Sequence, residues 1–423
     1  ISTVALCRRS GAPMSIEVPS SSHAGSHERQ AAVDALLERF TDFDPNRSAP
    51  ADRLPLAVPP FGKEELAAAM GCLLDGWLTM GPEVRAFEAE WAEWMGADHT
   101  IMVNSGSSAL LVMLSALIET GRLQRGDEVL VPAVGWSTSL FSVAQAGLTP
   151  VLVDVDRHSL GLEGSYDRPV LALHLLGSPC RAESPLLLED ACGAHGATID
   201  GAKVGARGLA GTFSFFFSHH ITTGEGGAIT TNDAEFADAC RSLRAHGWVR
   251  ERTDRTAREA DHPHIDPRFL FLSPGFNVRP MEVSGAMGRV QLRRLDDFVA
   301  RRRANHQQWC ALIQDAELPI DVFPELPGTT HAAFGFPMML REDAPLDRPA
   351  LCAVLEAKGI TTRPISGANL ARQPAFDKVP GVRVEGDLSV ANAIHDRGLF
   401  VGQSHAFDHR HGELLLDALQ AAF

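Results

Sequence analysis

The chain has 423 residues, a formal net charge of −15 and a hydrophobic content of 45%. This length favours two domains around a large core, and the composition is typical of a globular protein in water. The acidic balance offers no basic face for nucleic acid, and no apolar run approaches the ~20 residues that span a bilayer. We therefore expect neither nucleic acid nor a membrane as a partner.

The cysteines favour reduced thiols. There are seven of them, an odd number, with no C-x-x-C pair and no zinc-ligand spacing. The N-terminus has no apolar segment after Arg8 and Arg9, so it does not read as a signal peptide. We expect a cytoplasmic protein.

Residues 1–50 are rich in Ser, His, Pro and Arg, and we expect a partly disordered N-terminal extension with one possible helix at 28–40. Helices are then predicted at 63–78 and at 83–95, the second of which begins at Pro82. The ordered part of the chain begins with this pair.

From residue 100 onward, short apolar strands alternate with helices. Strands are predicted at 100–103, 128–131, 150–153, 169–174, 185–189 and 227–231, and helices at 107–119 and 137–146. Such alternation is typical of βαβ units and of a mostly parallel sheet. Ligands of such sheets bind at the carboxyl ends of the strands.

The segment from 233 to 299 reads as a transition to a second domain. It is predicted to contain a helix from about 233 to 246, a charged surface loop at 250–268, a turn at 274–277 and a long helix at 281–299. We therefore assign 51–295 to a large domain and 296–423 to a smaller C-terminal α/β domain.

The segment from 211 to 227 organises the functional interpretation. Its apolar run Phe213–Phe217 ends at Ser218-His219-His220 and is followed by Gly224-Glu225-Gly226-Gly227, so a buried strand is predicted to stop at two imidazoles and a glycine turn. An imidazole moves protons near neutrality, which suits an active site. The alternatives are a metal site or a satisfied core histidine.

Three further motifs follow predicted strands. Residues 104–108, NSGSS, precede a helix expected to begin near Ser107, and are typical of a phosphate cup or of a plain serine N-cap. Asp190 ends an apolar run, so its carboxylate is expected to be buried. A buried carboxylate is costly unless it pairs with a cation, such as a protonated pyridine nitrogen. The alternatives are a helix cap and a structural ion pair. Trp136 either lies flat on a cofactor ring or belongs to the core.

Taken together, these motifs resemble the sugar-modifying aminotransferase/dehydratase branch of the fold-type-I pyridoxal phosphate (PLP) enzymes. They are most similar to the GDP-4-keto-6-deoxymannose 3-dehydratases. The resemblance covers about residues 55 to 405, with GWLTMG at 76–81, VNSGSSA at 103–109, VPAVGWST at 131–138, LLEDACG at 187–193, FSHHITTGEGG at 217–227, LRAHGW at 243–248 and GFNVRPMEVSGA at 275–286. It implies an α/β, fold-type-I aminotransferase-like fold whose large domain holds a mixed, mostly parallel sheet.

The resemblance also implies roles for individual residues. Gly106, Ser107 and Ser214 would bind the cofactor phosphate, Trp136 would stack on the ring and Asp190 would pair with its nitrogen. Asn277 would reach that phosphate from the other subunit, which implies a homodimer with shared active sites.

His219 occupies the position, counted from Ser214, at which relatives carry the lysine that forms a Schiff base with PLP. An imidazole cannot form that imine, which argues against an ordinary aminotransferase. The resemblance implies that His219 is the general base and acid, with His246 as a helper. It further implies that glutamate converts PLP to pyridoxamine phosphate (PMP), and that the 3-hydroxyl of a nucleotide-linked 4-keto-6-deoxy sugar, expected to carry GDP, then departs.

A second group of relatives with this histidine carries an iron-sulfur cluster. Cys192 matches its first ligand, but residues 246–270 contain no cysteine, and four thiolates are normally required. We expect no cluster.

Gly193 departs from the family pattern, in which a Gln or acidic residue faces the ring hydroxyl of the cofactor. Two alternatives to the dehydratase therefore stay open. One is a related PLP or PMP enzyme that acts on another keto substrate in a secondary-metabolite pathway, which Gly193 favours. The other is a non-catalytic PLP-fold partner.

Overall fold

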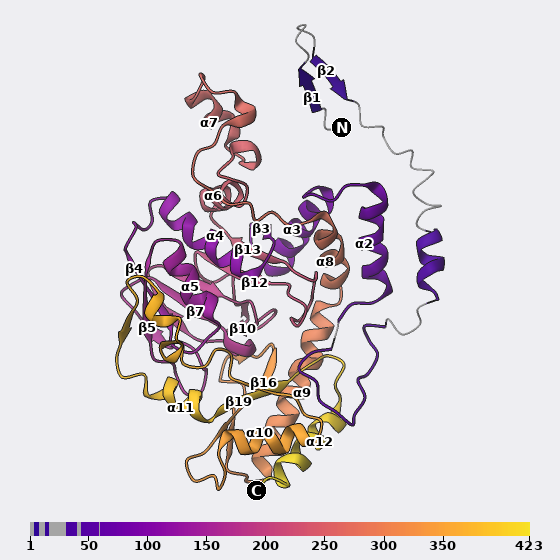
Figure 1. Cartoon of the computed structure of the whole chain (residues 1–423), viewed down its shortest axis with the longest axis vertical. Helices are drawn as coiled ribbons and strands as arrows, with labels where there is room; N and C mark the ends of the chain where they lie inside the picture. The colour runs from indigo at the N-terminus through magenta and orange to yellow at the C-terminus, as the bar shows by residue number, and fades with distance from the viewer. Residues whose placement is uncertain (1–3, 8–12, 17–30, 40–43, 59) are drawn as a thin grey trace.

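The computed structural model describes residues 4–7, 13–16, 31–39, 44–58 and 60–423. A large sheet lies among helices in the upper part of Figure 1, and a smaller sheet with its own helices lies below it. No helix among the described residues is both long enough and apolar enough to cross a bilayer.

The large sheet has eight strands in the order β18-β5-β4-β7-β9-β12-β13-β3. Their bounds are β3 (His99–Val103), β4 (Glu128–Pro132), β5 (Thr149–Val153), β7 (Val170–Leu173), β9 (Leu187–Asp190), β12 (Ala210–Ser214), β13 (Gly227–Thr231) and β18 (Arg383–Glu385). All neighbours from β18 to β12 pair in parallel, whereas β13 is antiparallel to both β12 and β3. The predicted mixed, mostly parallel sheet is confirmed.

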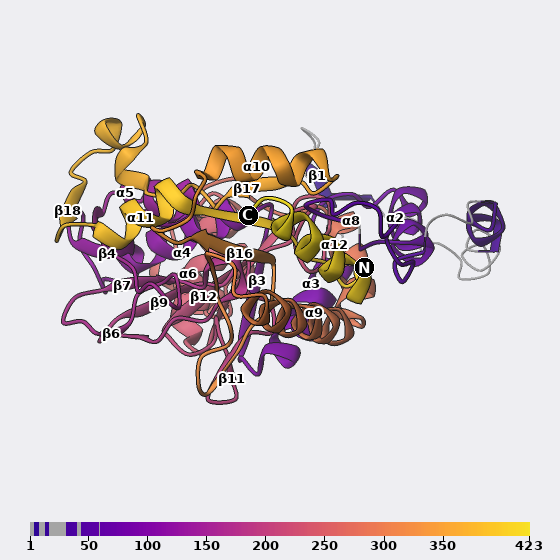
Figure 2. The same cartoon turned by 90° about the horizontal axis from the view of Figure 1, so that it is seen from below.

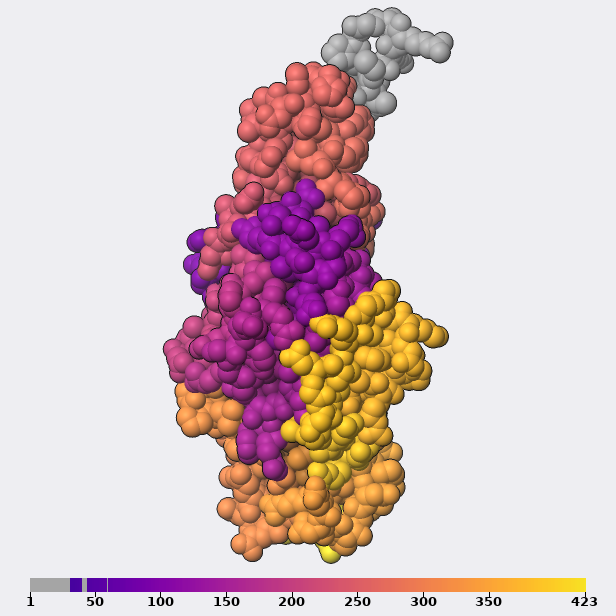
Figure 3. All heavy atoms as spheres, turned by 90° about the vertical axis from the view of Figure 1, so that its left-hand side faces the viewer, coloured from indigo at the N-terminus to yellow at the C-terminus, as the bar shows by residue number. Residues whose placement is uncertain are grey.

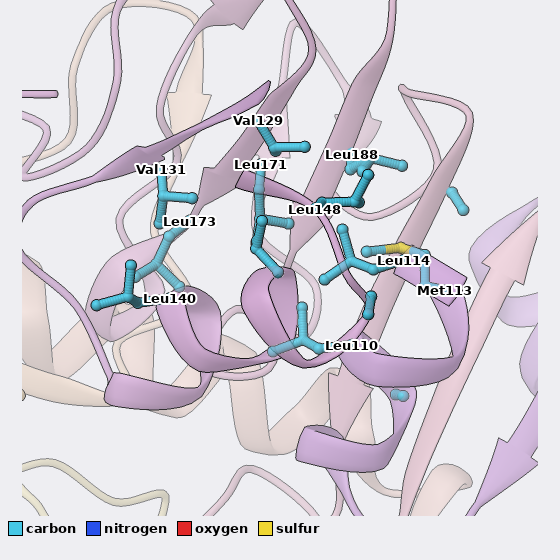
Figure 4. Packing of buried hydrophobic residues seen from close by; sticks show 14 of the residues in the cluster. Leu110, Met113, Leu114, Val129, Val131, Leu140, Leu148, Leu171, Leu173 and Leu188 are labelled. Atoms are coloured by element: carbon cyan, nitrogen blue, oxygen red, sulfur yellow. The ribbon is translucent and has the colours of Figure 1, made fainter. Parts of the chain in front are cut away.

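The helices of this part of the chain are α2 (Lys63–Asp75), α3 (Pro82–Met95), α4 (Gly106–Glu119), α5 (Ser137–Gln145), α6 (Ala234–Arg244), α7 (Arg255–Asp261) and α8 (Glu282–Leu292). Figure 4 shows how α4 packs, with Leu110 and Leu114 facing Leu171 of β7. Each of these leucines is at most 1% exposed. Burial of one such side chain contributes roughly 1.5–3 kcal/mol, so this packing fixes α4 against the sheet.

The smaller sheet is antiparallel, in the order β14-β16-β19-β17. It comprises β14 (Ile320–Val322), β16 (Gly335–Leu340), β17 (Thr362–Pro364) and β19 (Gly398–Gly402), with helices α9 (Leu295–Asp315), α10 (Arg348–Ala357), α11 (Ser389–Arg397) and α12 (His409–Gln420). Figure 2 shows α10 and α12 over this sheet. Its core includes Trp309 and Phe336, together with Ala49 and Leu54 from the N-terminal side.

The two parts of the molecule are joined along one side. β18, from the C-terminal third, pairs in parallel with β5 at the edge of the large sheet. Figure 3 shows this C-terminal region, in yellow, lying against the purple part of the large domain. The remaining short strands are β6 (Gly164–Ser165), β8 (Ala182–Glu183), β10 (Thr198–Ile199), β11 (Ala202–Lys203) and β15 (Thr329–Thr330).

Several predicted elements differ from the structure. The helix predicted at 63–78 ends at Asp75, because Gly76 adopts the left-handed conformation (φ 71°) that terminates helices. The helix predicted at 281–299 is two helices, α8 and α9, which break at 293–294. There Arg294 donates to the buried carboxylate of Glu65 (2.5 Å), and α9 turns towards the smaller sheet.

The segment 250–268, predicted to be a surface loop, contains the helix α7. The ion pairs Arg255–Glu259 (2.5 Å) and Arg258–Asp254 (2.9 Å) have the i,i+4 spacing that stabilises a helix. Hydropathy alone missed this helix because it has no buried face. Figure 1 shows it projecting at the top of the molecule.

At the N-terminus, a helix at 31–37 lies within the predicted 28–40. Residues 28–30 of that prediction lie outside the described residues, as does most of the stretch expected to be disordered. Two short strands, β1 (Val4–Cys7) and β2 (Pro13–Ile16), pair antiparallel and were not expected from the sequence.

Candidate active site

The predicted site residues gather at one edge of the large sheet. Asp190 ends β9, and Ser214 ends β12. The antiparallel β13 begins at Gly227, which pairs with Ser214 on one side and with Val103, the last residue of β3, on the other. The carboxyl ends of three parallel strands and the start of β13 therefore meet here, as the ligand rule for such sheets requires.

Next to this edge, the N-terminus of α4 forms the predicted cup. The helix begins at Gly106, one residue before the predicted start, and its N-cap is Ser105, whose Oγ accepts a hydrogen bond from the Ser108 amide (3.1 Å). The plain N-cap interpretation therefore holds for Ser105. Ser107 is exposed on the first turn, where the helix dipole and free amides favour an anion.

Two glycines allow this cup to approach the strands closely. A Cβ on Gly106 would lie 2.7 Å from Cβ of Ser214 and 3.0 Å from Sγ of Cys192. A Cβ on Gly227 would lie 2.4 Å from the Ser105 carbonyl. Only glycine fits at these two positions, so the cup is a surface of backbone and small hydroxyls that matches a phosphate group.

Asp190 is buried, with 3% of its surface exposed, and it accepts hydrogen bonds from Ser139 Oγ (2.8 Å) and the Cys192 amide (3.2 Å). Burial raises the pKa of its carboxyl. Its partners are neutral, and none of the ion pairs among the described residues includes it. A buried carboxylate in this state fits a cationic ligand group such as a protonated pyridine nitrogen. Sequence reasoning missed Ser139, whose role depends on the fold.

Trp136 precedes α5 and is 61% exposed. It therefore does not belong to the core, which was the alternative to a cofactor platform. Its position, three residues before the serine that holds Asp190, places it at the same edge of the sheet.

The strand before the imidazoles is shorter than predicted. It ends at Ser214, and Phe216 and Phe217 are 44% and 42% exposed. The Phe216 amide donates to Ser214 Oγ (3.3 Å) instead of continuing the ladder, and the His219 amide donates to the Phe216 carbonyl (3.0 Å). The two imidazoles therefore follow a turn, because local side-chain and turn hydrogen bonds compete with the strand.

The side chain of His219 is half-buried, and its ring lies 4.9 Å from that of Phe334 and 6.2 Å from that of Phe216, measured between centroids. Its Nδ1 atom is buried and has no hydrogen-bond partner among the described residues. Burial and the positive charge of Arg302 lower the pKa of this imidazole to about 3. At neutral pH the ring is therefore neutral, and its Nδ1 atom carries either a free lone pair or a free N–H, depending on the tautomer.

His220 is the satisfied core histidine of the pair. It is fully buried, its Nε2 lies 2.8 Å from the Ala332 carbonyl, and its Nδ1 lies 2.9 Å from Nδ1 of His195. Burial lowers the pKa of both rings well below the usual value. Among the described residues, no group of three or more His, Cys, Asp or Glu side chains is arranged to hold a metal ion.

Asn277 and His246 lie together on a different segment. Ala245 and Asn277 form an antiparallel bridge, and the His246 amide donates to the Phe276 carbonyl (2.6 Å). His246 lines a cavity of about 560 Å³ whose wall also contains Trp248, Phe269, Phe271, Pro274 and Gly275. The Asn104 amide donates to the Val278 carbonyl (3.0 Å), so this segment borders the cup.

The chain contains only four lysines, at 63, 203, 358 and 378. Lys63 pairs with Glu38, and the Lys203 ammonium binds the Trp94 carbonyl and lies over the Trp94 ring. Lys358 follows α10, and Lys378 lies on a short 3-10 helix of the C-terminal third. None of the four belongs to the strand ends described above, so no amine is available there to form an imine.

Comparison with known proteins agrees with this geometry. The model of the DegT/DnrJ/EryC1/StrS aminotransferase family matches residues 59–420. GDP-4-keto-6-deoxy-D-mannose 3-dehydratase of Yersinia pseudotuberculosis is 36% identical over 376 residues, which are 84% of this chain and 94% of that protein. The dTDP-4-dehydro-2,6-dideoxy-D-glucose 3-dehydratase of Saccharopolyspora spinosa is 31% identical, with 88% of each chain covered.

A solved structure of GDP-4-keto-6-deoxymannose-3-dehydratase, with a trapped PLP–glutamate geminal diamine, aligns with a TM-score of 0.78 and 32% identity. The alignment covers 87% of this chain and 100% of that one. The resemblance and the fold-type-I architecture expected from the sequence are thereby confirmed. The chain belongs to the DegT/DnrJ/EryC1/StrS aminotransferase family.

Proposed function

We propose that this protein is a PLP/PMP-dependent 3-dehydratase that removes the 3-hydroxyl of a nucleotide-linked 4-keto-6-deoxy sugar, with glutamate as amino donor. The observation that carries the proposal is His219. It is a neutral imidazole beside the strand ends of the large sheet, and none of the four lysines of the chain belongs to these strand ends. The relatives at 31–36% identity are 3-dehydratases of such sugars, which supports the same assignment.

The residues at the sheet edge fit this cofactor. Gly106, Ser107 and Ser214 would hold the phosphate, Asp190 would pair with the ring nitrogen, and Trp136 would cover the ring. When bound, the group supplies the amine, through glutamate, and an electron sink. The structure of a relative with a PLP–glutamate adduct supports glutamate as the donor.

His219 supplies the proton transfers. Its neutral ring accepts a proton at the reacting centre, and the protonated ring then donates to the departing 3-hydroxyl oxygen. A low pKa serves the second step because it makes the imidazolium a stronger acid. With no amine at position 219, the proton is not returned to the sugar, so dehydration replaces amino transfer.

We propose a cytoplasmic homodimer with shared sites. Asn277 is exposed at the edge of the cup, and Trp77, Leu78, Phe217 and Met281 are exposed apolar side chains of the kind that an interface covers. Asn277 would reach the cofactor phosphate of the other subunit, and His246 would assist His219. The six described cysteines are free thiols, which fits a reducing compartment.

Subunit complementation tests the shared site. A mixed dimer of Asn277→Arg and His219→Asn subunits contains one site with both residues intact if each site takes Asn277 from the partner. We expect each homodimer to be inactive and the mixture to regain up to about a quarter of the activity, because random mixing gives half heterodimers. No recovery in a verified heterodimer would place both residues in one subunit's site.

GDP is the proposed nucleotide, because the GDP-sugar enzyme is the more similar of the two relatives compared above. A second candidate is a related enzyme for another keto substrate. Gly193 favours it, because the family pattern has a Gln or acidic residue there, and the glycine leaves out that side chain next to the Phe334 ring, which lies 3.7 Å from the position of a Cβ. A dTDP-linked keto sugar is therefore the first alternative to test.

The test is mass spectrometry of the sugar after incubation with PLP, glutamate and GDP-4-keto-6-deoxymannose. We expect a 4-keto-3,6-dideoxy product lacking one oxygen, with release of ammonia and 2-oxoglutarate. An amino sugar would contradict the role of His219. If the GDP sugar is unchanged, the dTDP-linked keto sugar is tested next, and dehydration of that sugar alone would correct the nucleotide.

A further inference from the structure

Arg302 is an unusual charge behind the imidazoles. It lies on α9 with 1% of its surface exposed, and none of the ion pairs among the described residues includes it. Its Nη1 donates to the carbonyls of Ala333 (3.3 Å), Phe334 (3.4 Å) and Gln403 (2.5 Å). A buried cation held only by carbonyl oxygens is costly, which lowers the pKa of this guanidinium to about 9.

Two of the three carbonyls that hold Arg302, those of Ala333 and Phe334, belong to the segment that contacts the catalytic imidazole. Ala333 has φ 50°, and its amide donates to His331 Nδ1 (2.7 Å), while the Phe334 amide donates to the Leu176 carbonyl (3.0 Å). The ring of Phe334 then lies against His219. The guanidinium therefore fixes the main chain from which this ring projects, in a strained conformation that needs such support.

The same charge faces a group of neutral rings. The titratable groups around His219 are His220 on its own turn, His195 on the turn after β9, and Arg302 on α9. Burial, and to a smaller degree the positive charge of Arg302, lowers the pKa of all three imidazoles. His220 donates Nε2–H to the Ala332 carbonyl, so its Nδ1 accepts from His195, and this arrangement requires no charge on either ring.

We propose that Arg302 is a positioning residue for His219. Its guanidinium clamps the segment 333–334 so that Phe334 orients the imidazole. Its unpaired charge keeps that imidazole unprotonated and makes the protonated ring a strong donor. The part of this inference that concerns proton delivery rests on the proposed dehydration, whereas the ionisation state of His219 does not.

Two substitutions separate the charge from the clamp. Arg302→Gln keeps a side-chain donor for the carbonyls but removes the charge, and Arg302→Lys keeps the charge. Arg303→Gln is the matched control, because the neighbouring Arg303 is 40% exposed and pairs with Glu325 (2.6 Å). The readout is the ¹³Cε1 resonance of His219 in histidine-labelled, PLP-loaded protein, titrated from pH 8.5 to 3 and assigned by its loss in His219→Asn.

We expect the wild-type resonance, and that of Arg302→Lys and Arg303→Gln, to show no titration above pH 5. In Arg302→Gln the midpoint should rise by about one pH unit or more, as removal of one buried charge predicts. The acid limb of the kcat profile should move by the same amount. A profile in Arg302→Gln identical to wild type would overturn the proposal.

The wild-type titration decides the matter even if Arg302→Gln does not fold, because a wild-type midpoint near 6.5 would also overturn the inference. The resonance is measured without turnover. If no sugar is dehydrated but the midpoints behave as expected, the proposed function fails while the assignment of Arg302 stands. If dehydration occurs and the midpoints do not differ, the reverse holds.

Discussion

The two sides of the site handle burial in opposite ways. The cofactor side, formed by the strand ends and the start of α4, holds a buried carboxylate, Asp190, among neutral donors and helix amides. The imidazole side holds neutral rings, among them His195 and His220, beside the buried cation of Arg302. Burial raises the pKa of the carboxyl and lowers the pKa of the imidazoles.

The difference shows which side needs a charged ligand. A buried carboxylate without an ion pair is complete only when a cation binds, so the first side is built for a ligand. The neutral rings beside the unpaired guanidinium need no charged ligand. They differ from a histidine in water only in their lower affinity for protons. We therefore expect the first region to bind the ligand and the second to set the proton chemistry.

The largest effect is expected for His219→Asn, which removes the base and keeps the size of a polar side chain. The rate of dehydration should fall by about 10³-fold or more, while the absorbance titration with PLP stays close to wild type, because the cup at the N-terminus of α4 and Asp190 are unchanged. His158→Asn, at an exposed histidine, serves as the control. Retained turnover in His219→Asn would mean that another group is the base.

His219→Lys sharpens the same contrast. The new amine lies where relatives carry their Schiff-base lysine, so borohydride should fix PLP to the variant and not to the wild type. Dehydration should be lost. Covalent PLP on any of the four native lysines after reduction would contradict the assignment of position 219.

Asp190→Asn tests the cofactor side. The Asn oxygen can still accept from the Cys192 amide and its NH2 group can donate to Ser139 Oγ, but the side chain has no charge for a pyridinium. We expect PLP affinity to fall by about 10²-fold, equivalent to ~3 kcal/mol, and dehydration to fall further. Ser139→Ala keeps the charge and should cost about tenfold or less. Equal losses in the two variants would mean that the hydrogen bond, and not the charge, matters.

The cofactor side was largely predictable from sequence. Asp190 and the NSGSS segment each follow an apolar strand, and the rule that strand ends meet at one edge brings them together. The errors there are small: the helix begins at Gly106 instead of Ser107, and β12 ends at Ser214 instead of Phe217. Both arise from local hydrogen bonds by serine side chains, which hydropathy does not detect.

The imidazole side was predictable only at His219. His195 lies 24 residues before it, and Phe334 and Arg302 come from the C-terminal part of the chain. No spacing rule connects positions so far apart, because tertiary packing alone joins them. The role assigned to Asn277 depends on a second subunit, and the roles of Asn277 and His246 both stay predictions.

Gly106→Ala probes the close contact between the cup at the start of α4 and Ser214 of β12. The added Cβ would lie 2.7 Å from Cβ of Ser214, so α4 or β12 must shift, at a cost of about 1–3 kcal/mol in unfolding free energy. We expect PLP affinity to fall about tenfold. The control is Gly71→Ala within α2, where nothing lies within 4 Å of the new Cβ and a stabilisation of roughly 0.5–1 kcal/mol is expected. Similar effects of both substitutions would show that the close approach is not required.

The smallest effect is the acid dependence of stability. His195, His220 and His331 are at most 2% exposed, and burial lowers the pKa of each well below 6.5. The unfolded chain therefore binds protons first as the pH falls below about 6.5, and each ring costs up to ~1.4 kcal/mol of stability per pH unit. Carboxylates with lowered pKa values, such as Asp254 at about 2, act only at lower pH.

Urea unfolding between pH 6.5 and 5 measures this slope. We expect the unfolding free energy to fall as the pH falls, with a slope that corresponds to the uptake of about three protons or more on unfolding. His331→Gln should take up about one proton fewer, because it lacks one titrating ring. Its Gln oxygen can still accept from the Ala333 amide, so the hydrogen bond is kept. An unfolding free energy that is constant over this range would mean that the imidazoles are protonated in the folded protein. The contrast between a buried carboxylate that lacks a cation and imidazoles that stay neutral would then be wrong, because the imidazoles would carry positive charge at the pH of catalysis.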